Sequence, residues 1–424
     1  MQVQQKSTFI QSFGGINFIH EQIIRQKFHR LVSENIGDRN VRATYSYGDI
    51  LAQMFYTDLI GGEVLDDNSI LKMQLQDHPT LQIASADTIE YSFQELKQPT
   101  TEIETKKGVV HQMNEHHKFN RLLPAIGKRF GLFKKEKSYL MDYDGHIVEN
   151  NKSDNATTYK MSEGYYPVVC SIGKLPVFIQ NRNGNTPEGY NQLPVIKTAI
   201  QNCRDNGIKV GAFRSDSCSY QKATIEFLED NDIVYYIRAE QSTRLLDALE
   251  DETEWEPVIL NHKKVEVCSI EEKLLGKDRR VVAYRYEIEG QKTIFDRQKY
   301  RYYAVITSDT EKSPLNCIEF YNQRGCEGEH HFKELDYDFN WSNLPFDNME
   351  MNTIYFYAKA IAYLLFYATK RHLVSKRISF VEQAMRLKRF TLHFVTLPAK
   401  WIKSGRRNIL KIFTHKNYKP LYQT

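Results

Sequence analysis

The feature that most constrains the fold is a change of hydrophobic period near residue 138. Before it, apolar residues recur at helical spacing, as in residues 18–28 and 50–60. After it come three strand-like runs over residues 138–143, 166–172 and 175–180, then a helix, a strand over 208–214, a helix and a strand over 233–237. The sequence therefore predicts a helical region followed by an α/β domain.

The order of three strands, helix, strand, helix and strand is expected of a ribonuclease-H-like α/β core. Short β-rich pieces between Arg238 and Phe320 interrupt this pattern and predict a β-rich insertion. The apolar segment 354–368 predicts a buried helix that lies against the sheet. We expect five parts: a helical N-terminal DNA-binding region (1–130), the first part of the core (131–238), the insertion (239–320), the second part of the core with a catalytic glutamate (321–370) and a helical, basic C-terminal region (371–424).

Composition and charge restrict the environment in which the chain works. Its 424 residues are 41% hydrophobic, which is enough to bury large cores. Six cysteines without a CxxC pair argue against a zinc ribbon and a secreted disulfide framework, and favour a reducing cytoplasm. The N-terminus lacks the apolar core of a signal peptide, and segment 354–368 is shorter than the roughly 20 residues of a membrane span. No membrane partner is expected.

Positive charge is concentrated near the C-terminus. Between Lys370 and Lys419 there are many lysines and arginines but only one acidic residue, Glu382, and aromatic residues are interleaved with the basic ones. Such a segment suits a surface that follows a phosphate backbone. A basic amphipathic helix on anionic lipid is the rival interpretation, but Pro398 and the lack of a sustained apolar face weaken it. The candidate DNA contacts in this segment are Arg386, Lys388, Arg389, Arg406 and Arg407.

Three acidic residues stand where metal-dependent chemistry on nucleic acid needs carboxylates. Asp144 and Asp216 end strand-like runs, and Glu329 lies where a loop is expected to run into a helix. Hard divalent cations take oxygen ligands, and two such ions about 3.5–4 Å apart stabilise both oxygens of a displacement at phosphorus. A single aspartate after a strand is more often a turn former or helix cap. Their joint placement predicts catalytic residues that bind Mg²⁺ (or Mn²⁺), with two ions expected.

Two of these assignments have close competitors. Asp142 would point to the same face of the sheet as Asp144 if the strand continues, so it is an alternative ligand or a supporting partner. Glu327 competes with Glu329, and because residues two apart on a helix diverge by about 200°, only one of them can face the metal ions. Sequence reasoning leaves both alternatives open.

The residues around these acids resemble a known family, the DDE transposases of bacterial insertion sequences, group 1, with a β-rich insertion before the glutamate. Asp144 precedes Gly145, and Arg214-Ser215-Asp216-Ser217 is similar to the family's second aspartate motif. The segment from Tyr321 through Arg324 to Glu329 resembles the Tyr/Arg/Glu signature, with one extra residue between the Arg and the Glu. The distance from Glu329 to Asp338-Phe339-Asn340-Trp341 agrees with the family, which selects Glu329 over Glu327. The signature's lysine is displaced, and Lys333 is its candidate substitute.

The resemblance implies cut-and-paste transposition. DNA would be hydrolysed at the element ends, a hairpin intermediate would form, and a 3′-hydroxyl would attack target DNA. Tyr321, Arg324 and Lys333 would contact DNA, and Trp255 would stack on an extruded base, although a lone Trp in a β-rich piece is more often core. The implied partners are double-stranded DNA, as terminal inverted repeats and target, and a second copy of the chain in a homodimer on paired ends. The implied location is the bacterial cytoplasm, in association with the nucleoid.

Two other functions remain as alternatives. A ribonuclease-H-like nuclease would cut DNA without joining it, and an inactive or domesticated regulator would bind DNA without needing the three acids. The presence of Asp144, Asp216 and Glu329 disfavours the regulator. The terminal repeat, the target preference and the activity of this copy are outside what the sequence determines.

Overall fold

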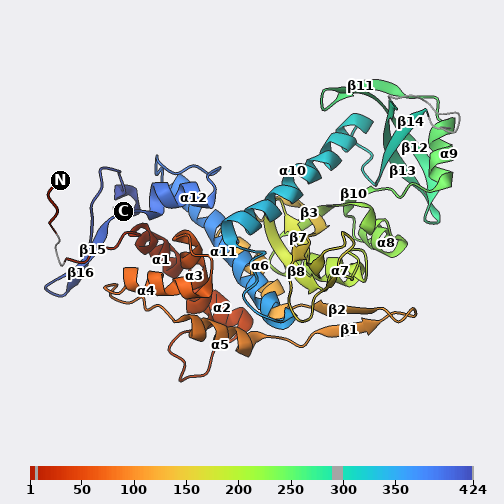
Figure 1. Ribbon diagram of the computed structural model, residues 1–424. Helices are drawn as coiled ribbons and strands as arrows, with labels where there is room; N and C mark the ends of the chain where they lie inside the picture. The colour runs from red at the N-terminus through yellow and green to blue at the C-terminus, as the bar shows by residue number, and fades with distance from the viewer. Residues whose placement is uncertain (5–7, 289–298, 423–424) are drawn as a thin grey trace.

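A computed structural model describes residues 1–4, 8–288 and 299–422, and for residues 326–330 it describes the backbone alone (Figure 1). Its centre is an eleven-stranded sheet with the strand order β1-β2-β8-β7-β3-β9-β10-β14-β13-β12-β11. The strands of this sheet are β1 (Thr101–Glu104), β2 (Val110–Asn114), β3 (Ser138–Gly145), β7 (Val168–Ile172), β8 (Leu175–Arg182), β9 (Lys209–Ser215), β10 (Val234–Arg238), β11 (Glu256–Leu260), β12 (Lys263–Leu274), β13 (Lys277–Glu287) and β14 (Tyr300–Thr307).

The middle of the sheet contains the strands that the hydrophobic pattern predicts. β7 pairs antiparallel with both β3 and β8, and a short turn joins β7 to β8. Between β3 and β7 the chain forms a small separate sheet of β4 (Val148–Glu149), β6 (Glu163–Tyr165) and β5 (Ala156–Thr157). Helices α7 (Gln192–Asp205) and α8 (Lys222–Asp230) are the crossovers that make β9 and β10 parallel to β3. In this register Tyr143 lies opposite Ser215, so the next residues, Asp144 and Asp216, leave the same edge of the sheet side by side.

The β-rich segment extends this sheet. β14 pairs antiparallel with β10, and β13, β12 and β11 follow in turn. Helix α9 (Thr243–Asp251) precedes these strands, and together they form the upper right part of Figure 1. The predicted runs 265–270, 280–288 and 302–308 correspond to β12, β13 and β14. They could be recognised because their apolar side chains recur on the buried face of the sheet.

Helix α11 (Met349–Ser375) packs between the N-terminal helices and the sheet (Figure 1). It is buried along most of its length, as its apolar sequence predicts. Its Tyr357 hydroxyl donates to the Ile179 carbonyl of β8 at 2.8 Å, and its Lys359 forms a buried ion pair with Asp58. The remaining helices of this layer are α1 (Gly15–Arg25), α2 (Phe28–Ile36), α3 (Tyr47–Leu59), α4 (Asn68–Gln74), α5 (Ala86–Leu96) and α6 (His117–Arg129).

The expectation of a helical C-terminal region was wrong. Helix α12 (Leu387–Phe390) continues only as a π-helical turn over Thr391–Val395. The chain then forms a hairpin of β15 (Ala399–Ser404) and β16 (Arg407–Ile412). Basic residues obscure the apolar cross-strand pairs Trp401–Leu410 and Ile402–Ile409, and Gly405 supplies the positive φ of the turn. A second departure is the β1–β2 hairpin, which lies in the region expected to be mainly helical.

The C-terminal segment is fastened to the start of the chain. Gln11 and Ala399 exchange two backbone hydrogen bonds of 2.9 and 3.0 Å, and the Trp401 indole N–H donates to Asn17 Oδ1 at 3.0 Å. Gly15 makes the closest approach, because a Cβ there would lie 2.3 Å from the carbonyl oxygen of Phe394 and 2.7 Å from Val395 Cα. Residues far apart in sequence thus share one core with α1.

Gly15→Ala is therefore expected to destabilise the protein by about 1–3 kcal/mol, since a new methyl group would meet backbone atoms that cannot rotate away. Urea unfolding followed by circular dichroism measures the change. An unchanged midpoint would mean that the C-terminal segment is not held against α1. Alanine also has a better helix propensity than glycine, by about 1 kcal/mol, and this alone would stabilise the variant. A measured destabilisation would therefore underestimate the steric effect.

Candidate active site

The site lies at the edge of the sheet where β3 and β9 end. Asp144 is the penultimate residue of β3, and Asp216 follows β9 directly. The Asp216 carboxylate caps a short 3₁₀ helix (Ser217–Ser219), because its Oδ1 accepts the Cys218 backbone N–H at 2.8 Å. The side chains remain 20% and 34% exposed, respectively, so both carboxylates can be reached from solvent.

Helix α10 (Pro314–Phe339) carries Arg324 to the two aspartates. Its Nη2 lies 2.9 Å from Asp144 Oδ1 and 3.8 Å from Asp216 Oδ2. Tyr321 stands about one turn earlier on the helix, and burial raises its pKa to about 12. The expectation that this segment is a loop running into a helix was wrong. Ser313 caps the helix and Pro314 occupies its first turn, so α10 begins well before the signature residues.

Glu327 and Glu329 lie on α10, but their side chains are outside the described residues. The structure therefore shows that the helix carrying both glutamates lies at the site. The preference for Glu329 over Glu327 still rests on the sequence spacing.

Asp142 is held in a buried ion pair. Its Oδ1 and Oδ2 accept from Arg214 Nε and Nη2 at 2.6 and 2.9 Å, and both side chains are at most 2% exposed. Arg214 Nη1 also donates to the Phe320 carbonyl at 2.6 Å, which ties β9 to the start of α10. The geometry therefore favours Asp144 over Asp142 as the residue available to a metal ion, and it gives the arginine of the Arg214-Ser215-Asp216 motif a structural role.

The carboxylates share an environment that opposes negative charge. The pKa of Asp144 is raised to about 6. Burial is the main cause, the charge of Asp216 adds to the rise, and the charge of Arg324 opposes it. Burial likewise raises the pKa of Glu188 to about 8, with Asp216 and Asp144 adding to the effect. Carboxylates that are close together and poorly hydrated are stabilised in their ionised form by a nearby positive charge, such as a cation.

Glu188 is the site residue that sequence reasoning missed. It lies in the loop between β8 and α7, is 8% exposed, and accepts from the Tyr166 hydroxyl at 2.9 Å. Ligand atoms of Glu188, Asp216 and Cys218 lie within 4.8 Å of one another, the one such group found among the described side chains. The surrounding sequence Asn183-Gly184-Asn185-Thr186-Pro187-Glu188-Gly189 reads as a turn, and no spacing rule marks its glutamate.

A pocket of about 830 Å³ opens beside Asp216. Its lining includes Tyr159, Tyr166, Glu188, Cys218 and Glu240. Tyr159 is 68% exposed at its rim. Asp216 lines this pocket and is also approached by Arg324 of α10, whose Nη2 lies 3.8 Å from its Oδ2.

The candidate DNA contacts differ in their surroundings. Lys388, Arg389, Arg406 and Arg407 are exposed, as is Lys333 on α10. Arg386 instead forms a two-bond ion pair with Asp338, with both distances 2.9 Å, which holds the C-terminal segment to α10.

Trp255 has a packing role in the structure. Its indole N–H donates to the Glu252 carbonyl at 2.9 Å, and the Arg285 guanidinium lies 4.1 Å from its ring centre. The side chain is half-buried against the core beneath β12–β14. This arrangement matches the packing alternative, and stacking on a base would require the Arg285 contact to change.

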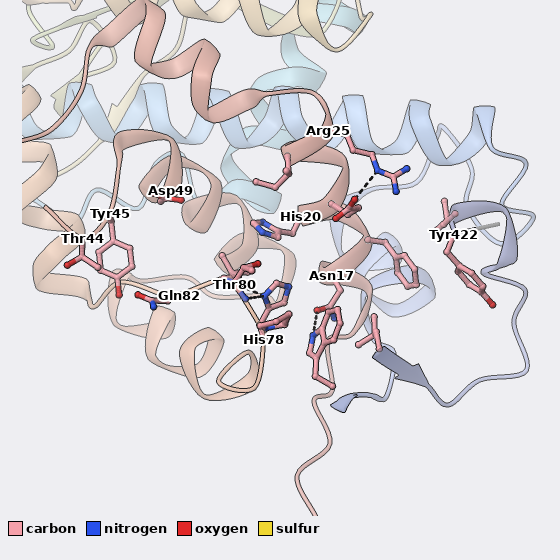
Figure 2. Close-up of a pocket in the computed structure, with 18 residues that line it drawn as sticks. Asn17, His20, Arg25, Thr44, Tyr45, Asp49, His78, Thr80, Gln82 and Tyr422 are labelled. Atoms are coloured by element: carbon pink, nitrogen blue, oxygen red, sulfur yellow. Dashed lines mark hydrogen bonds and ion pairs between the residues drawn. The ribbon is translucent and has the colours of Figure 1, made fainter. Parts of the chain in front are cut away.

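A second pocket, of about 680 Å³, lies between α1, the segment around His78 and the C-terminal hairpin (Figure 2). Figure 2 shows His20 and His78 facing one another, and their ring centres are 5.4 Å apart. Burial lowers the pKa of each to about 4, so both imidazoles are neutral at physiological pH. The pocket is lined mainly by aromatic and uncharged polar groups and lies away from the strand-end carboxylates.

The fold and the site together define an α/β enzyme whose acidic residues meet at the ends of parallel strands, next to an arginine. A sequence model of the family described as transposase DDE domain group 1 matches residues 1–424, and the chain belongs to this family. The protein is a transposase, which confirms the function that the motifs predict. No curated protein sequence matches the chain.

Among solved structures, the chain is similar to a piggyBac transposase synaptic complex with hairpin DNA determined by cryo-electron microscopy. The similarity covers 90% of this chain and 79% of that chain, with 10% sequence identity and a TM-score of 0.42. Within the described residues, no helix has the length and apolarity that crossing a membrane requires.

Proposed function

We propose that this transposase cuts DNA at the ends of its element and joins the freed 3′-hydroxyl to target DNA by a two-metal mechanism, with Asp144, Asp216 and Glu329 as catalytic metal ligands. The observation that carries the proposal is the placement of Asp144 and Asp216 side by side with Arg324. The strand order β8-β7-β3-β9-β10, with β7 antiparallel to β3, supports a ribonuclease-H-like core.

The residues present fit a divalent cation such as Mg²⁺ or Mn²⁺. The donors are carboxylate oxygens, which hard cations prefer, and a buried oxygen of Glu188 has no hydrogen-bond partner among the described residues. When bound, two such ions would activate the attacking oxygen and stabilise the leaving oxygen. Asp144 and Asp216 would hold the ions, together with Glu329 from α10.

Arg324 and Tyr321 are placed to orient the DNA phosphate. The Arg324 Nε is buried and lacks a partner among the described residues, so part of the guanidinium fork remains available. A guanidinium binds phosphate oxygens through charge-assisted hydrogen bonds, and these position the phosphorus beside the carboxylates. Arg324 would thus exchange part of its contact with Asp144 for a contact with DNA when the cations are present.

The remaining assignments complete the proposal. Exposed Lys333, Lys388, Arg389, Arg406 and Arg407 would follow the DNA backbone, while Arg386 would hold α10 in place. The N-terminal region would recognise the terminal repeats, and two copies would act on paired ends through a hairpin intermediate. The setting would be the nucleoid of a bacterial cytoplasm. The parts 1–130, 131–238, 239–320, 321–370 and 371–424 are proposed as functional units.

Purified protein incubated with Mg²⁺ and DNA carrying the ends that flank its reading frame tests the proposal. On a denaturing gel we expect nicks at the ends, followed by hairpin and joined products. End cleavage without any joined product would favour a nuclease that does not transfer strands. Binding without cleavage in either Mg²⁺ or Mn²⁺ would overturn the proposed chemistry.

Replacing Arg406 and Arg407 together by glutamine is expected to weaken DNA binding and to reduce its salt dependence. Each lost phosphate contact lowers the slope of log K against log salt by about 0.9, so the double variant should lose about 1.8. Fluorescence anisotropy at several salt concentrations measures the slope. Arg386→Gln is the contrasting variant, because Asp338 already neutralises that side chain. Equal slopes in the wild type and the double variant would remove the hairpin from the DNA-binding surface.

A further inference from the structure

Glu188 is fixed in position by a buried arginine. The Arg182 side chain is fully buried, and its Nη1 donates to the carbonyls of Pro187, Glu188 and Tyr190 at 3.0, 2.9 and 2.9 Å. The Tyr143 hydroxyl of β3 donates to the same Glu188 carbonyl at 2.6 Å. A loop that would otherwise be free to move is therefore held to the sheet by its backbone.

The same loop is joined to the turn that carries Asp216. Gln221 Nε2 donates to the Gly189 carbonyl at 2.8 Å and to the Cys218 carbonyl at 3.0 Å. Gly189 packs so closely that a Cβ there would lie 2.7 Å from the Cys218 carbonyl oxygen. Contacts of the neighbouring residues Gly189 and Cys218 therefore hold the Glu188 loop beside the turn that carries Asp216.

One oxygen of Glu188 is left without a partner. Oε2 accepts from the Tyr166 hydroxyl, whereas Oε1 is buried and has no hydrogen-bond partner among the described residues. An unpartnered carboxylate oxygen away from water is costly unless a cation or a donor completes it. A carboxylate oxygen of Glu188 lies within 4.8 Å of ligand atoms of Asp216 and Cys218. The Asp216 carboxylate cannot donate a hydrogen bond when it is ionised.

We propose that Glu188 is a further metal ligand of this transposase and binds, through Oε1, the cation held by Asp216. The inference rests on the proposed function for the presence of a cation at Asp216, and it adds a carboxylate from the β8–α7 loop to the ligands from β3, β9 and α10. Cys218 supplies its backbone N–H to Asp216 and is not included among the ligands, because hard cations prefer oxygen.

Binding of Mn²⁺ to the full chain, followed by electron paramagnetic resonance, tests the inference without requiring DNA cleavage. Glu188→Gln is expected to weaken Mn²⁺ binding by about tenfold or more. The amide oxygen can still accept from Tyr166, so the loop should keep its position. Glu240→Gln is the matched control, since Glu240 lines the same pocket but is exposed, and its variant should bind Mn²⁺ like the wild type.

Asp216→Asn separates the inference from the proposed function. If Asp216→Asn loses Mn²⁺ while Glu188→Gln binds it like the wild type, Glu188 is not a ligand and the proposed function stands. If both variants bind Mn²⁺ like the wild type, the cation lies elsewhere and both proposals fail.

A second measurement on the wild type does not depend on the variants folding. Fe²⁺ with ascorbate and peroxide cuts the backbone next to bound iron, and mass spectrometry locates the cuts. Cuts near residues 188 and 216 that excess Mg²⁺ suppresses are expected. Cuts near 216 without any near 188 would overturn the role of Glu188.

Discussion

Asp216→Asn is expected to slow DNA end cleavage by about a thousandfold, which corresponds to about 4 kcal/mol of lost transition-state stabilisation. The substitution replaces the negatively charged carboxylate at the end of β9 with a neutral amide, which is a weaker metal ligand. It keeps an oxygen that can accept the Cys218 N–H at the position of Oδ1, so the turn should remain folded. Single-turnover cleavage of end DNA in Mg²⁺, resolved on a denaturing gel, measures the rate.

Asp230→Asn is the control for this variant. Asp230 ends α8 and is exposed, and it lies at the edge of the sheet where β10 begins, opposite the edge where β9 ends. Cleavage should be unaffected there, and end binding should be retained in both variants. Wild-type cleavage by Asp216→Asn would remove Asp216 from the chemistry.

Arg214→Met is expected to lower the free energy of unfolding by about 3–5 kcal/mol. The substitution leaves the Asp142 carboxylate buried beside an apolar side chain, and the Phe320 carbonyl loses a donor. Replacing both partners, as Asp142→Leu with Arg214→Met, should recover much of the loss because the charge of Asp142 is removed together with that of Arg214. Urea unfolding of the single and double variants gives the two values.

Arg204→Met, on the exposed last turn of α7, provides the comparison for this series. A surface arginine should change stability by no more than about 0.5 kcal/mol. If Arg214→Met had the same midpoint as Arg204→Met, the Asp142–Arg214 pair would not stabilise the fold, and Asp142 would again compete with Asp144 as a metal ligand.

The core strands and the first two carboxylates could be predicted because their signals are local. Short apolar runs mark β3, β7 and β9, apolar residues at a period of 3.6 mark α7, and a long apolar segment marks α11. Asp144 lies at the end of β3 and Asp216 directly follows β9, so the two meet if these strands are parallel neighbours. The C-terminal hairpin was missed because its charged residues concealed the apolar pairs on either side of Gly405.

The sequence by itself thus determined the family, the α/β core and two acids at strand ends, since hydrophobic period and short motifs are properties of neighbouring residues. Only the tertiary structure showed that Asp142 is held in a buried ion pair while Asp144 and Asp216 remain partly exposed. Arg214 binds Asp142 across two strands, and Arg182 fixes the loop that brings Glu188 to Asp216. Such choices depend on contacts between distant segments, where burial makes each unpaired charge costly, and no local pattern records them.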